Sequence, residues 1–105
     1  MTLPSSLRKI NCSDNKLSNI YFLEHCHLLE ELTIANNLLY DLKLTFKSSK
    51  NNLKSLNGEF RYKNLMFFDC SCNKIQFIEG LINAINLTVL KMSQNQLTFT
   101  RNVIN

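Results

Sequence analysis

The sequence predicts an α/β solenoid: a short right-handed superhelix with a parallel β-sheet on its concave wall and short helices or 3₁₀ turns on its convex side. Two observations predict it. A template of apolar residues with one fixed asparagine recurs four times along the 105 residues. Between these asparagines, apolar residues continue at a spacing of three. Turns that bury their apolar side chains only against neighbouring turns form solenoids, so we expect one domain over residues 1–105.

The template reads apolar, two variable, apolar, one variable, apolar, two variable, Asn, one variable, apolar. The four asparagines are spaced 22, 36 and 22 residues apart, at Asn15, Asn37, Asn73 and Asn95. The repeat cores are LRKINCSDNKLSNI (7–20), LEELTIANNLLYDL (29–42), LMFFDCSCNKIQFI (65–78) and LTVLKMSQNQLTFT (87–100).

Each core contains a short segment with strand periodicity, such as Ile10-Asn-Cys12 or Leu32-Thr-Ile34, in which two apolar residues face one side. Stacked turns place these segments side by side as a parallel sheet. The asparagines follow the strands, where the backbone bends and loses its ladder partners. A buried amide supplies two donors and two acceptor lone pairs, so we expect an asparagine ladder between adjacent turns.

The return paths of the chain, at residues 18–29 and 79–86, are short. Their apolar residues at a spacing of three predict one or two turns of helix or 3₁₀ helix on the convex side.

This template resembles the leucine-rich repeat family, in the 22-residue class typified by cytosolic regulators of protein phosphatase 1. The resemblance covers about 85 of the 105 residues and recurs four times. It implies a protein partner bound on the concave face, with a phosphatase as the most specific guess, and a cytoplasmic or nuclear location.

The variable strand positions form three columns on the expected concave face. Phe67 beside Val89 is an exposed apolar pair suited to anchor a partner, and the small third column would leave room for it. The columns are Lys9, Glu31, Phe67 and Val89; then Asn11, Thr33, Asp69 and Lys91; then Ser13, Ala35, Ser71 and Ser93.

The middle of the chain departs from the period and carries the net charge of +4. We favour a basic insertion at about 43–64 in the convex connection of one long repeat. The alternative is a degenerate extra repeat with a compressed strand near Leu44-Thr-Phe46. Lysines here, with Phe46, Phe60 and Tyr62, leave RNA or an acidic membrane surface as a further, disfavoured partner.

The cysteines and histidines suggest metal or redox chemistry, but the repeat explains them better. Cys70 shares an inward column with Cys12 and Met92, and Cys72 lies near the surface. His25 and His27 flank an inward Cys26 and are expected to be solvated. We expect no metal, no cofactor, no disulfide and no enzyme activity, since no nucleophile, phosphate loop or carboxylate pair stands out.

The sequence therefore predicts a non-catalytic interaction module, a regulatory or adaptor subunit. A second interpretation is a structural part of a longer receptor or multidomain protein, because a solenoid needs caps and the chain stops ten residues after Asn95. Open ends also predict end-to-end association. No apolar run approaches the roughly 18 residues of a membrane span.

Overall fold

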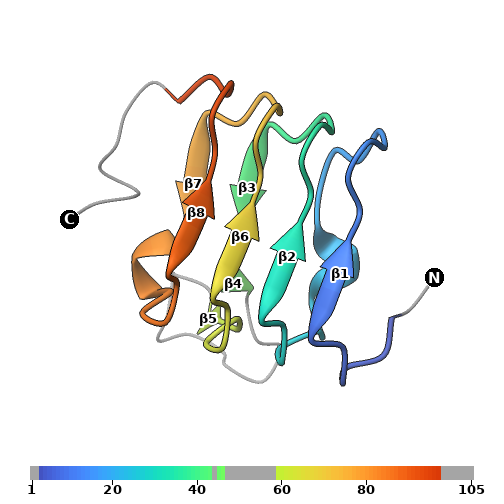
Figure 1. Ribbon diagram of the computed structural model, residues 1–105, viewed down its shortest axis with the longest axis vertical. Coiled ribbons are helices and arrows are strands. Elements are labelled where there is room, and N and C mark those ends of the chain that lie inside the picture. The colour runs from blue at the N-terminus through green and yellow to red at the C-terminus, as the bar shows by residue number, and fades with distance from the viewer. Residues whose placement is uncertain (1–2, 44, 47–58, 98–105) are drawn as a thin grey trace.

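The computed structural model describes residues 3–43, 45–46 and 59–97. Its front layer is a four-stranded parallel sheet (Figure 1), in the order β1-β2-β6-β8. The strands are β1 (Lys9–Asn11), β2 (Glu31–Thr33), β6 (Phe67–Asp69) and β8 (Val89–Lys91). The parallel sheet expected from the repeats is therefore confirmed.

The middle residue of each strand points into the protein. Ile10 pairs with Leu32, Leu32 with Phe68, and Phe68 with Leu90, so one apolar column runs through the sheet. Leu32 and Phe68, on the inner strands, are fully buried, whereas Ile10 and Leu90, on the outer strands, are partly buried. Each strand is only three residues long, so packing between neighbouring turns supplies most of the burial.

A second layer lies behind the sheet (Figure 1). It contains two 3₁₀ turns, η1 (Tyr21–Leu23) and η2 (Leu81–Asn83), and a two-stranded parallel pair of β3 (Asp41–Lys43) with β7 (Phe77–Glu79). The described part of the chain holds no α-helix, but both 3₁₀ turns lie within the return paths 18–29 and 79–86, so the prediction of short helices or 3₁₀ turns is confirmed there in its 3₁₀ form. Return paths this short allow a single 3₁₀ turn, whereas an isolated α-helix needs more residues to form.

Three of the four repeated asparagines make the same set of bonds between turns. The Asn73 amide donates to Ile34 O of the preceding turn at 3.1 Å and to Cys70 O and Ser71 O of its own turn. Its Oδ1 accepts from Leu39 N at 3.0 Å. Asn37 and Asn95 repeat this pattern on their own preceding turns. The predicted asparagine ladder is present at these three positions.

Asn15 departs from the ladder. It is exposed, and among the described residues it donates only to Cys12 O and Ser13 O of its own turn. The prediction that all four asparagines bond across adjacent turns is therefore wrong for Asn15. The physical reason is that its carbonyl and amide have no preceding strand beside them in the described sheet, which begins with β1.

The residue before each ladder asparagine adopts a left-handed backbone conformation, which the sequence analysis missed. The φ angles are 61° at Asp14, 60° at Asn36, 57° at Cys72 and 57° at Gln94. This conformation turns the chain out of the strand. It also places the N–H of Asp14, Asn36 and Cys72 against carbonyls of the next turn, at Ala35, Ser71 and Ser93. Asparagine and aspartate tolerate this region better than cysteine or glutamine.

The described residues of the irregular middle add no strand to the four-stranded sheet. β2 pairs directly with β6, which is what one long repeat with an insertion predicts. The strand expected near Leu44-Thr-Phe46 under the alternative does form at β4 (Thr45–Phe46), but it pairs antiparallel with β5 (Glu59–Phe60) in a separate sheet. Lys47, Lys50 and Lys54 lie outside the described residues.

Candidate functional site

The outward strand positions form the aligned columns that the sequence predicts. Lys9 pairs with Glu31, Glu31 with Phe67, and Phe67 with Val89. The second column, Asn11, Thr33, Asp69 and Lys91, is also in register. We call these eight outward residues the strand face. The third column, Ser13, Ala35, Ser71 and Ser93, follows just beyond the strands.

Charges on the β1 and β2 side of the strand face are paired. Lys9 Nζ lies 3.3 Å from Glu31 Oε2, and beside them Arg8 Nη1 lies 2.9 Å from Glu30 Oε2. Both pairs are largely exposed to solvent, where an ion pair contributes between zero and about 1 kcal/mol. A small hollow of about 330 Å³ opens next to them, lined by Lys9, Ile10, Asn11, Glu31 and Thr33.

The other half of the strand face is apolar with one charge over it. Val89 is 39% exposed, but Phe67 is only partly exposed, so the expectation of an exposed Phe67–Val89 pair is correct for Val89 alone. Lys91 Nζ lies 5.7 Å from the centre of the Phe67 ring. This cation–π contact, together with neighbouring strands on both sides, covers part of the phenylalanine.

Two polar residues of the second column have a local structural role. Asn11 Oδ1 accepts from Ser13 N, and Asp69 Oδ1 accepts from Ser71 N, both at 3.0 Å. These bonds form Asx turns that lead the chain from the strand into the left-handed residue. Thr33 and Lys91 hold the same position without a carboxylate or amide, and their side chains remain available at the surface.

The third column is less open than expected. Ser13, Ala35 and Ser71 are half-buried, and only Ser93 is exposed. Within the described residues, the buried Ser13 Oγ has no hydrogen-bond partner. The column therefore leaves less room for a partner than the sequence predicts.

The cysteines follow the repeat. Cys70 is fully buried, and burial, followed by the nearby Asp69 carboxylate, raises the pKa of its thiol to about 12. Burial also raises the pKa of the Cys12 and Cys26 thiols. Cys72 is exposed, and its Sγ lies 3.4 Å from Gln94 Oε1. The inward position of Cys70 and the surface position of Cys72 are confirmed; all four thiols are free.

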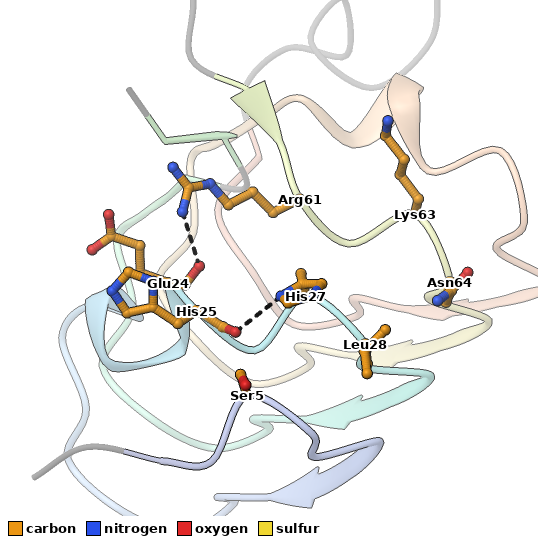
Figure 2. Close-up of a pocket in the computed structure, with 8 residues that line it drawn as sticks. All are labelled: Ser5, Glu24, His25, His27, Leu28, Arg61, Lys63 and Asn64. Carbon is orange, nitrogen blue, oxygen red and sulfur yellow. Dashed lines mark hydrogen bonds between the residues drawn. The ribbon is translucent and has the colours of Figure 1, made fainter. Parts of the chain in front are cut away.

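A second hollow, of about 820 Å³, lies away from the strand face (Figure 2). His25 and His27 are exposed and Cys26 is buried, as predicted. The structure also brings these histidines together with the end of the basic insertion, which sequence reasoning treated separately. The lining residues are Ser5, Glu24, His25, His27, Leu28, Arg61, Lys63 and Asn64.

The described ranges show neither a metal-binding cluster nor a membrane-spanning helix. They contain no group of three or more histidine, cysteine, aspartate or glutamate side chains arranged to hold a metal ion. Nor do these ranges contain a helix with the length and apolarity needed to cross a membrane. Comparison of the sequence with models of known protein families and with curated proteins finds no match.

Proposed function

We propose that the chain is a short leucine-rich-repeat solenoid that works as a non-catalytic interaction module, binding a protein partner on the strand face. The observation that carries the proposal is the register of the outward columns. Four strands hold eight variable side chains at fixed positions, while the inward column and the asparagine ladder build the scaffold.

The composition of the strand face supports a protein partner. It combines an apolar half, at Phe67 and Val89, with charges at Lys9, Glu31 and Lys91. Protein interfaces commonly join an apolar anchor to a polar rim. The small hollow beside Lys9 and Glu31 would accept one side chain of the partner.

The fold proposal rests on recurrence. The same bonds connect Asn37, Asn73 and Asn95 to the turn before each of them, and the same left-handed residue precedes each one. The repeat class favours the role of a cytoplasmic or nuclear regulatory subunit. Capture experiments would identify the partner, a phosphatase or another protein.

Partner capture with surface variants tests this proposal. Phe67→Ser and Lys91→Glu remove the aromatic ring and the cation above it, and each should lower partner recovery about tenfold or more. Tyr21→Ser and Lys74→Glu are matched controls, because both side chains are exposed and lie off the strand face. A partner retained by both face variants, or lost equally with the controls, contradicts the proposal.

A further inference from the structure

The second hollow is formed by two short segments in which burial alternates. In one, Cys26 is 1% exposed and the flanking His25 and His27 are exposed. In the other, Tyr62 is fully buried while Arg61 is partly exposed and Lys63 exposed. Each segment thus places its middle side chain in the core and its two nitrogen-bearing neighbours at the surface.

Hydrogen bonds fix the two segments against one another. The Tyr62 hydroxyl donates to Leu23 O at 2.9 Å, and Arg61 Nη1 donates to Glu24 O at 3.4 Å. On the other side, Asn86 Nδ2 donates to Lys63 O at 2.7 Å. The burial that raises the Tyr62 pKa keeps its hydroxyl protonated and able to donate. The walls of the hollow are therefore held by bonds to backbone carbonyls of two segments, at Leu23, Glu24 and Lys63.

The lining is rich in hydrogen-bond donors. Ser5, Arg61, Lys63 and Asn64 can all donate at neutral pH. His27 Nδ1 lies 3.2 Å from His25 O, so its other ring nitrogen donates when the ring is protonated. Glu24 is the only acidic side chain among the eight lining residues.

The single carboxylate leaves one end of the hollow cationic. Figure 2 shows Glu24 beside His25 at one end, with Lys63 and Asn64 at the other. Among the ion pairs in the described residues, none involves Lys63. Lys63 and Asn64 line this end of the hollow, and Glu24, the one acidic residue of the lining, lies at the other end.

We propose that this hollow binds a phosphate group, either as the free ion or carried by a small phosphate monoester. Side chains from three segments line the hollow, at Ser5, at residues 24–28 and at residues 61–64, and the several acceptor oxygens of a phosphate can bond to donors on different sides of it. Guanidinium and ammonium groups are the side chains that bind phosphate most strongly. A volume of about 820 Å³ also accommodates the molecule that carries the phosphate.

The test is a titration of the full chain followed by amide chemical shifts at constant ionic strength. Inorganic phosphate should give saturable shifts centred on residues 25–28 and 61–64, and chloride should not. Lys63→Gln should weaken binding about tenfold, the loss expected for one charge-assisted bond. Lys74→Gln, which removes an exposed lysine elsewhere, should leave the affinity unchanged.

A parallel titration with glycerol phosphate separates the two sources of the group. Tighter binding than inorganic phosphate indicates a monoester ligand, and equal binding indicates the free ion. Equal weakening by Lys63→Gln and Lys74→Gln overturns the proposal, because binding would then follow net charge. So does Lys63-dependent binding of a short RNA with no response to phosphate. None of the lining residues belongs to the strand face, so this test is independent of the proposed protein partner.

Discussion

The turns built around Asn15 and Asn73 share one sequence template but differ in what surrounds them. Asn73 is 7% exposed and bonds to the turn before it, whereas Asn15 is exposed and, among the residues that the structure describes, bonds only within its own turn. The strands differ in the same way, since Phe68 is buried and Ile10 only partly so. The same template therefore gives different energetic roles, and the neighbouring turn decides which role a residue has.

Replacing each of the two asparagines by leucine should give the largest difference in stability between the two turns. Asn73→Leu leaves the buried Leu39 N–H without its acceptor and removes one of the two donors from each of three carbonyls. It should lower the free energy of unfolding by about 3 kcal/mol. Asn15→Leu should cost less than about 0.5 kcal/mol because water can replace its exposed bonds. Denaturant midpoints measure both. Equal losses would contradict the distinction between inner and outer turns.

The next largest effect on stability should come from Tyr62, whose hydroxyl bonds the end of the insertion to Leu23 of the second layer. Tyr62→Phe removes the hydroxyl that donates to the buried Leu23 carbonyl, which keeps its bond from Cys26 N, and should lower the free energy of unfolding by about 1 kcal/mol. Tyr21→Phe is the matched control, because Tyr21 is 60% exposed and its loss should change stability by less than about 0.5 kcal/mol. Thermal and urea unfolding measure both variants. A similar loss of stability in both would show that the Tyr62 hydroxyl bond does not stabilise the fold.

The buried Cys70 thiol should make the protein less stable at alkaline pH. The folded-state pKa of Cys70 is about 12 against an ordinary value of 9.0, so the unfolded state loses this proton first as the pH rises. The contribution of the Cys70 thiol to the free energy of unfolding is fully present below about pH 9. Between about pH 9 and pH 12 the free energy of unfolding falls by about 1.4 kcal/mol per pH unit. Cys70→Ala should make the pH dependence shallower by this amount. Urea unfolding at pH 8, 9 and 10 measures the slopes.

The smallest effect should appear in the left-handed column. Cys72 adopts a φ of 57°, which asparagine tolerates better, so Cys72→Asn should raise the free energy of unfolding by about 0.5 to 1 kcal/mol. Asp14→Asn exchanges two tolerant residues at the equivalent position and should be close to neutral. If Cys72→Asn destabilises the protein in chemical denaturation, the bond from Cys72 Sγ to Gln94 outweighs the backbone strain.

The sequence predicts the front layer well because its information is periodic. The alternation around Ile10 and Leu32 places the strands, and the spacing of 22 residues aligns the columns, Phe67 against Val89 included. The left-handed column has no such signal. Asp14 and Asn36 suggest it, but Cys72 and Gln94 do not, and none of the four is glycine.

The second layer and the phosphate-binding hollow depend on contacts between residues far apart in the sequence. Arg61 reaches Glu24 across 37 positions, and no position of the repeat specifies that contact. Periodicity does align β3 with β7 at the ends of the cores 29–42 and 65–78, but it does not predict that these ends form strands. Nor does it predict the partial cover of Phe67 by Lys91, a side-chain contact between strands.

The ladder asparagines all bond in one direction, from each turn to the turn before it. Asn95 donates to Cys70 O and accepts from Ile75 N in the turn of Asn73, in addition to the backbone bonds between the two turns. Asn73 makes the equivalent bonds to Leu39 N and Ile34 O. A segment of 22 residues that contains one asparagine therefore brings part of its own attachment with it. Gene duplication could lengthen such a protein, or deletion shorten it, by whole segments without redesigning the joint that remains.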